Sequence, residues 1–149
     1  MILLIGRYEY SLDGKNRLAI PPKFREALLQ ERASRLYLTS GLESCLYLFL
    51  PSQWNKLLEN DLKVFSLPNK EQERAFKRKF FAEAIDVELD AVGRILIPHY
   101  LKDHAGLHTR VLVQGAGSRA EIWDRKKWDA YNKSKVLPAY RTVSRNLEI

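Results

Sequence analysis

The chain has 149 residues, 46% of them apolar and 11% aromatic, so it can bury the core of one domain and is not disordered over most of its length. Its 25 Lys and Arg residues outnumber its 18 Asp and Glu residues, and the net charge of +7 favours an anionic partner such as nucleic acid. The single cysteine, Cys45, excludes an intrachain disulfide and is expected to be a buried apolar side chain. Every apolar run is shorter than the roughly 20 residues of a membrane helix, so we expect a cytoplasmic protein with no membrane partner.

Two similar series of predicted elements follow one another along the chain. In the first series, the apolar patterns predict strands at 4–12, 17–20, 35–39 and 45–50, and helices at 23–31 and after Pro51. A connecting helix is predicted at 69–84, with Phe76, Phe80 and Ala84 on one apolar face. The second series has strands at 84–89, 94–97, 110–114 and 120–123, and helices at 99–105, ending at Gly106, and after Asp124, whose carboxylate can cap it. This is the pattern of an α+β fold.

The clearest sign of duplication is the stretch LDGKNRLAIPPKF, at 12–24, which returns as LDAVGRILIPHYL at 89–101. Both copies have Asp, three further residues and Arg, then an apolar run and Pro. One copy alone rarely buries enough surface to fold, so we expect the two to pack about a pseudo-twofold axis. The predicted divisions are a first repeat at 1–60, a connecting helical segment at 61–83, a second repeat at 84–132 and a C-terminal tail at 133–149, which is either a free tail or a clasp between subunits.

Each Asp-to-Arg stretch has the length of a β-hairpin with a three-residue loop. Such loops are usually a type I turn followed by one residue in the left-handed region, and that last position holds Asn16 in one copy and Gly93 in the other. These two residue types accept the left-handed conformation most readily. The carboxylates of Asp13 and Asp90 can accept hydrogen bonds from backbone N–H groups of the turn. We therefore expect these four residues to brace two stiff hairpins.

Two roles stay open for the arginines of these hairpins, Arg17 and Arg94. They can simply pair with the neighbouring carboxylates and close the turns. A guanidinium has five donors, however, and a carboxylate occupies at most two, so the others can reach a phosphate or a guanine edge.

The first copy is the more basic around its hairpin and is expected to make most of the phosphate contacts. It adds Lys15 at the loop tip and Lys23 and Arg25 after the prolines, where the second copy has Val92, Tyr100 and Lys102.

With these repeated motifs, the sequence resembles the MraZ family of bacterial transcription regulators. The resemblance covers about residues 5 to 132 and is carried by both Asp-to-Arg stretches, HAGL at 104–107, EIW at 121–123 and ERAFKRKFFAEA at 73–84. Either hairpin alone would indicate only the wider AbrB-like class of swapped-hairpin DNA-binding domains. One departure is Asn16, where the family usually has Gly before the first arginine.

The resemblance implies a fold, a partner and an assembly. It implies two tandem AbrB-like swapped-hairpin units that form a pseudo-twofold β-barrel with flanking helices, and homo-oligomeric rings that bind short direct repeats of double-stranded DNA. In that family the bound promoter drives the cell division and cell wall gene cluster, so the protein is expected to be associated with the nucleoid. The family's binding arginines fall on Arg17 and Arg94, and its loop lysine falls on Lys15.

Other classes of function have weaker support in the sequence. His99, His104 and His108 do not complete a convincing metal site, because Gly106 separates the last two and no further ligand is suitably spaced. No P-loop, nucleophile elbow or dinucleotide fingerprint is present, and a carboxylate beside an arginine is held ionised, which suits proton transfer poorly. We therefore expect no enzyme activity, cofactor, metal or small-molecule substrate. The alternative is a protein-binding or antitoxin-like module with the same hairpin domain.

Overall fold

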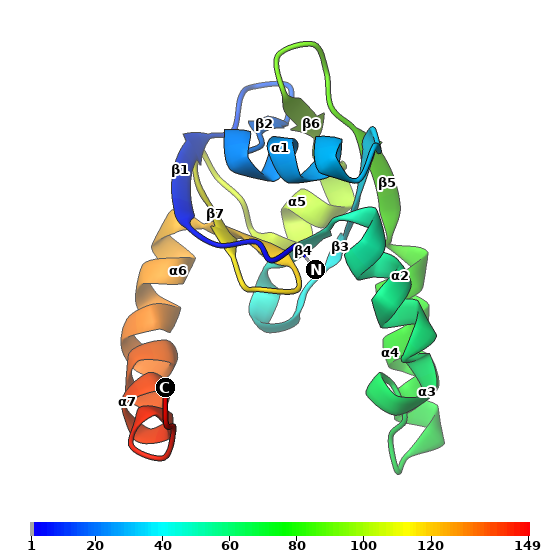
Figure 1. Ribbon diagram of the computed structural model, residues 1–149, viewed down its shortest axis with the longest axis vertical. Helices are drawn as coiled ribbons and strands as arrows, with labels where there is room; N and C mark the ends of the chain where they lie inside the picture. Colours follow the sequence, from blue (N-terminus) through cyan, green and yellow to red (C-terminus); the bar gives the residue numbers. More distant parts are fainter. Residues whose placement is uncertain (1) are drawn as a thin grey trace.

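The computed structural model describes residues 2–149 and shows the predicted order of elements twice (Figure 1). The first series comprises β1 (Arg7–Ser11), β2 (Arg17–Ala19), α1 (Pro22–Gln30), β3 (Arg35–Ser40), β4 (Leu46–Phe49) and α2 (Pro51–Glu59). A short helix α3 (Asp61–Val64) and the connecting helix α4 (Lys70–Ala82) follow. The second series comprises β5 (Ile85–Glu88), β6 (Arg94–Leu96), α5 (His99–Ala105), β7 (Arg110–Gly115), β8 (Ala120–Asp124) and α6 (Arg125–Tyr131).

The helix boundaries have local causes, and the sequence predicts those at Gly106 and Asp124. Pro22 occupies the first turn of α1, where its missing N–H costs nothing. The Asp124 carboxylate accepts a hydrogen bond from the Lys127 N–H and caps α6. Gly106 ends α5 in the left-handed conformation, with φ 58°.

Three strands of each repeat share one antiparallel sheet of six strands, in the order β1-β7-β8-β4-β3-β5. The first strand of each repeat pairs with the other repeat, since β1 pairs with β7 and β5 pairs with β3. The central pair, β4 with β8, also joins the repeats. Neither repeat therefore holds a complete sheet by itself.

The expectation of a barrel needs correction, because the sheet is open. Among the described strands, β1 and β5 stand at its two edges, and β2 and β6 form a separate two-stranded antiparallel ribbon. β1 is not paired with β2 in either sheet; in the turn between them, the Asp13 N–H donates to the Arg17 carbonyl at 3.1 Å. Since β2 and β6 leave the sheet to pair with each other, they do not close it into a cylinder.

The core has two parts. An aliphatic part includes Leu18 and Ile95 of the β2–β6 ribbon, both at most 1% exposed. An aromatic part includes Trp54 of α2, Phe80 of α4 and Trp128 of α6, all buried, where large aromatic side chains contribute much of the packing. Cys45 also lies in this part, and burial raises the pKa of its thiol.

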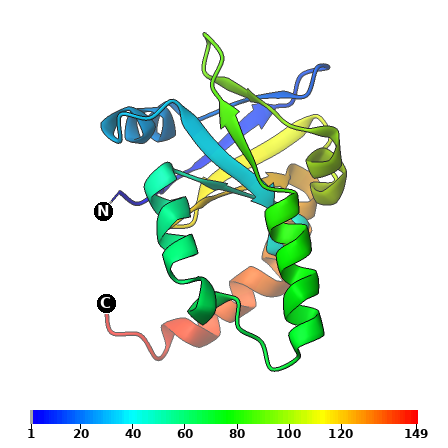
Figure 2. The ribbon, with the colours of Figure 1, turned by 90° about the vertical axis from the view of Figure 1, so that its right-hand side faces the viewer.

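The C-terminal residues are helical, which the sequence did not predict. A π-helical turn (Asn132–Val136) continues α6 into α7 (Leu137–Ser144). Pro138 lies in the first turn of α7, and the widened turn before it accommodates the missing donor. α6–α7 and α2–α4 extend from the sheet as two legs, opposite the end that carries the two hairpin loops (Figures 1 and 2). None of the helices within residues 2–149 is long and apolar enough to span a bilayer.

The three histidines do not gather in the structure. The His104 imidazole lies 3.0 Å from the Gly41 carbonyl oxygen, and that of His108 lies 3.2 Å from the Asp124 carboxylate. His99 faces Asp103 on the surface of α5. Each ring therefore has a local partner on a different part of the fold.

Candidate nucleic-acid interface

The loops that follow β1 and β5 both project from the end of the molecule opposite the legs, and Figure 2 shows their tips pointing apart (Figures 1 and 2). In the first loop, the Asp13 carboxylate accepts the N–H groups of Lys15 and Arg17 at 2.9 and 2.8 Å. In the second, Asp90 accepts those of Val92 and Arg94 at 3.0 and 2.9 Å. The two loops therefore have the same internal bracing.

The last loop residue is left-handed in both copies, as the loop length predicts. Asn16 has φ 61° and Gly93 has φ 82°. The carbonyl of Asn16 accepts the Ile97 N–H at 2.8 Å, and the carbonyl of Gly93 accepts the Ile20 N–H at 3.0 Å. These bonds cross from one repeat to the other, so each loop is anchored by the partner repeat.

The arginines and aspartates form one charged chain across the two repeats. Arg17 Nε donates to Asp13 at 2.7 Å, and Arg94 Nε donates to Asp90 at 2.9 Å. Arg94 Nη1 also lies 3.6 Å from the Asp13 carboxylate. Both arginine side chains stay about a third exposed, at 35% and 32%, so terminal guanidinium nitrogens remain available to a ligand.

The carboxylates of Asp13 and Asp90 are held ionised. The backbone hydrogen bond from Arg17 is the main cause that lowers the Asp13 pKa from 3.8 to about 2. The backbone hydrogen bond from Arg94 likewise lowers the Asp90 pKa. Two arginines and two aspartates sum to zero charge, so a net positive field at this end depends on the lysines and arginines around them.

The outer face of the β2–β6 ribbon carries the two arginines. Arg17 stands opposite Leu96, and Ala19 stands opposite Arg94. Because Leu18 and Ile95 point into the core, these four residues share the opposite face. The major groove of B-DNA is wide enough to admit a two-stranded ribbon of this kind.

The remaining predicted residues divide into exposed and bracing ones. Lys15 at the loop tip and Lys23 in the first turn of α1 are exposed. Arg25 is half-buried: its Nε donates to the Ile20 carbonyl at 3.1 Å. Its guanidinium also lies over Gly93, so close that a Cβ there would be 2.6 Å from Nη1. Arg25 thus packs its own repeat against the loop of the other.

Sequence reasoning did not list Lys102 as a site residue, although it stands at the position equivalent to Arg25. Its Nζ donates to the Asn16 side-chain oxygen at 2.9 Å. The departure from Gly at position 16 therefore brings a specific contact, in which a helix of the second repeat holds the loop of the first. The repeat alignment already paired Lys102 with Arg25, which was the available signal.

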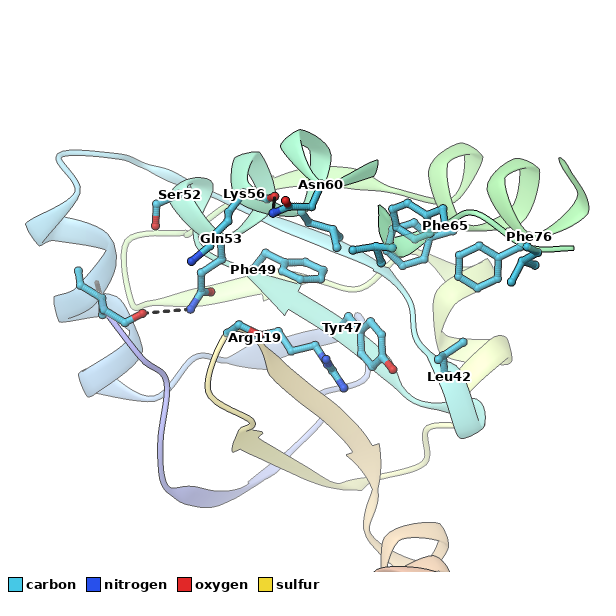
Figure 3. Close-up of a pocket in the computed structure, with 16 residues that line it drawn as sticks. Leu42, Tyr47, Phe49, Ser52, Gln53, Lys56, Asn60, Phe65, Phe76 and Arg119 are labelled. Carbon is cyan, nitrogen blue, oxygen red and sulfur yellow. Dashed lines mark hydrogen bonds between the residues drawn. The ribbon is translucent and has the colours of Figure 1, made fainter. Parts of the chain in front are cut away.

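A cavity lies elsewhere, between the sheet and the α2–α4 leg (Figure 3). It has a volume of about 700 Å³ and a mostly apolar lining that includes Tyr47, Phe49 and Phe65. Arg119 lies over the Tyr47 ring at 4.0 Å and pairs with Glu121 at 2.8 Å. Arg119, in the loop between β7 and β8, thus lies against the aromatic core rather than beside the hairpins.

Comparison with known proteins identifies the family. Residues 3–79 and 80–147 each match the family model of the "MraZ protein", whose description continues "antitoxin-like". A protein of Clostridium botulinum (strain Alaska E43 / Type E3), named "Transcriptional regulator MraZ", is 44% identical over 134 residues, which is 90% of each chain. A protein of Alkaliphilus metalliredigens (strain QYMF) with the same name is 41% identical over 146 residues, covering 98% of this chain and 97% of the relative. The chain belongs to the MraZ family.

Proposed function

We propose that the chain is a transcription regulator that binds double-stranded DNA with its hairpin end. The observation that carries this proposal is the pair of braced loops, which hold two partly free guanidinium groups on one outward face. Bracing matters because a side chain that is already oriented loses less conformational entropy when it binds. The net charge of +7 and the name of the relatives support the same function.

The proposed contacts have different chemistry. Arg17 and Arg94 are placed to donate to guanine edges or to phosphates. Lys15 and Lys23 are exposed point charges and suit phosphates. Arg25 contributes chiefly by holding the second loop in place, because its Nε already has a backbone acceptor.

The fold supports a finer assignment to two AbrB-like swapped-hairpin units. Its support is the pairing of β2 with β6, in which each hairpin sends its second strand to the other repeat. We further propose that several copies assemble into a ring that binds short direct repeats in the promoter of the chain's own cell division and cell wall gene cluster. Joining two or more weak sites would raise the apparent affinity by about 10² to 10⁴ through effective concentration.

The test is binding of the full chain to duplexes that carry the sequence upstream of its own operon, with all repeats or only one. Wild type should bind the multi-repeat duplex far more tightly, and this binding should weaken as salt increases. The Arg17→Ala, Arg94→Ala double variant should lose most of its affinity while keeping the wild-type fold and mass. Arg78→Ala, an exposed arginine on the α4 leg, is the matched control and should bind normally. Wild-type affinity in the folded double variant would rule out the hairpin site.

A second candidate is a protein-binding, antitoxin-like module, which the family description and the apolar cavity of Figure 3 favour. Such an interface would bury apolar surface and survive high salt, whereas phosphate contacts would not. Binding of the upstream duplex that disappears at high salt favours the first candidate.

A further inference from the structure

The hairpin face is symmetric in backbone but not in chemistry. At the equivalent positions of loop and ribbon, the first repeat has Lys15 and Ala19, and the second has Val92 and Leu96. Val92 is 65% exposed and Leu96 is 60% exposed. One half of this end thus presents a cation and a small side chain, and the other presents two large apolar side chains.

The fold gives no reason for these two apolar residues to face solvent. The inward position of β6 is filled by Ile95, which is 1% exposed, so Leu96 adds nothing to the core. One exposed leucine is ordinary on a protein surface. Here, however, Val92 and Leu96 stand on either side of Arg94 in the sequence, and Leu96 lies directly opposite Arg17 in the ribbon.

We propose that Leu96 and Val92 read thymine methyl groups in the major groove, beside the bases contacted by the arginines. This rests on the function proposed above and adds the specificity residues of that site. The major groove presents the C5-methyl of thymine next to the O6 and N7 acceptors of guanine. A face that alternates guanidinium and apolar side chains is complementary to such a mixed edge. The exposed lysines nearby supply the charge that attracts this partner.

The asymmetry also gives the protein a direction on DNA. Two identical halves would read the same bases on both strands, which produces a palindromic site. Because Leu96 replaces Ala19 and Val92 replaces Lys15 across the pseudo-twofold axis, the two halves read different base pairs. One chain then recognises a short DNA repeat whose sequence differs in the two directions. Copies related by a rotation within a ring would meet such repeats in the same orientation.

The test replaces thymine by deoxyuridine, one position at a time, in the multi-repeat duplex, since this removes only the methyl group. At one or more thymine positions in each DNA repeat the affinity of wild type should fall by about fourfold, the effect of losing the burial of one methyl group. Leu96→Ala should bind the thymine duplex more weakly and should lose the difference between thymine and deoxyuridine at its position. The variant is suited to the fold, because Ala19 already occupies the equivalent position. Leu29→Ala, an exposed leucine of α1, is the control and should discriminate as wild type does.

Each outcome decides the inference. Loss of discrimination in Leu96→Ala, with preserved mass and fold, supports it. Equal affinity of wild type for every deoxyuridine duplex overturns it and leaves the proposed DNA binding intact. A change of oligomeric mass in Leu96→Ala with unchanged discrimination also overturns it, because the apolar pair would then be a protein contact. If wild type does not bind the upstream duplex at all, the proposed function fails together with the inference.

Discussion

Replacement of Asn16 separates the two effects that hold the first loop, its left-handed backbone and its bond to Lys102. Asn16→Gly removes the steric cost of a Cβ at φ 61°, which gains about 0.5–1 kcal/mol. The same change removes the part-buried bond from Lys102 Nζ. Its loss costs only about 0.5–1 kcal/mol, since the ordering of the lysine side chain offsets part of the energy of the bond. The net change in the free energy of unfolding should therefore be within about 0.5 kcal/mol of zero.

Asn16→Val increases the strain of the left-handed backbone and also removes the bond to Lys102. A β-branched side chain is poorly tolerated in the left-handed region, at about 1–2 kcal/mol, and valine cannot accept from Lys102. The variant should be destabilised by about 2 kcal/mol in total. Lys102→Met keeps the aliphatic stem and removes only the bond, so it should cost about 0.5–1 kcal/mol in wild type and almost nothing in Asn16→Gly.

Urea unfolding followed by tryptophan fluorescence measures these values, because the three tryptophans, at 54, 123 and 128, are buried in one aromatic cluster. The m-values should match that of wild type, which shows that the change lies in stability. Equal stability of the Val and Gly variants would mean that position 16 is not left-handed. Full additivity of Asn16→Gly and Lys102→Met would mean that the cross-repeat bond contributes nothing.

Three further predictions concern the same end of the molecule. Gly93→Ala should destabilise by more than 1 kcal/mol in urea unfolding. Gly93 has a left-handed backbone, with φ 82°, and an added Cβ would also contact the guanidinium of Arg25. Folding lowers the Asp13 pKa from 3.8 to about 2, so between these pH values the unfolded chain binds more protons than the folded one. The free energy of unfolding should therefore fall as pH falls from about 4 to about 2. Asp13→Asn should show a smaller fall in the same urea measurement. Lys15→Ala should weaken DNA binding similarly for all sequences and reduce the slope of log affinity against log salt by about one, measured by fluorescence anisotropy.

Local chemistry made most of the elements predictable. The spacing from Asp13 to Arg17 determines a three-residue loop, and the requirement for a left-handed residue at its end follows from sterics alone. The prolines after each ribbon strand and the carboxylate of Asp124 mark helix starts for equally local reasons. The structure has all of these features where the sequence predicts them.

Long-range pairing was not predictable in the same way. Each hairpin could pair its second strand with its own first strand or, as in the structure, with the second strand of the other repeat. Both pairings bury the same alternating residues, so the sequence pattern does not distinguish them. The bond from Lys102 to Asn16 joins residues of different repeats, so no local pattern indicates it. Helix α7 was missed because its apolar residues stay exposed, with Tyr140 at 70% and Val143 at 53%, and the periodicity of a helix without a buried face is weak.

The fusion of two repeats in one chain explains why the departures from symmetry can persist. In a dimer of identical halves every substitution would appear at both hairpins, so a loop could not become Asn16 on one side and Gly93 on the other. Here each difference has its own partner, since Lys102 bonds to the Asn16 side chain and Arg25 occupies the space that Gly93 leaves open. The same freedom permits Leu96 opposite Arg17 and Ala19 opposite Arg94. Covalent linkage thus keeps a symmetric backbone while the outward side chains of the proposed DNA surface diverge, and this divergence is what a DNA repeat with a direction would require.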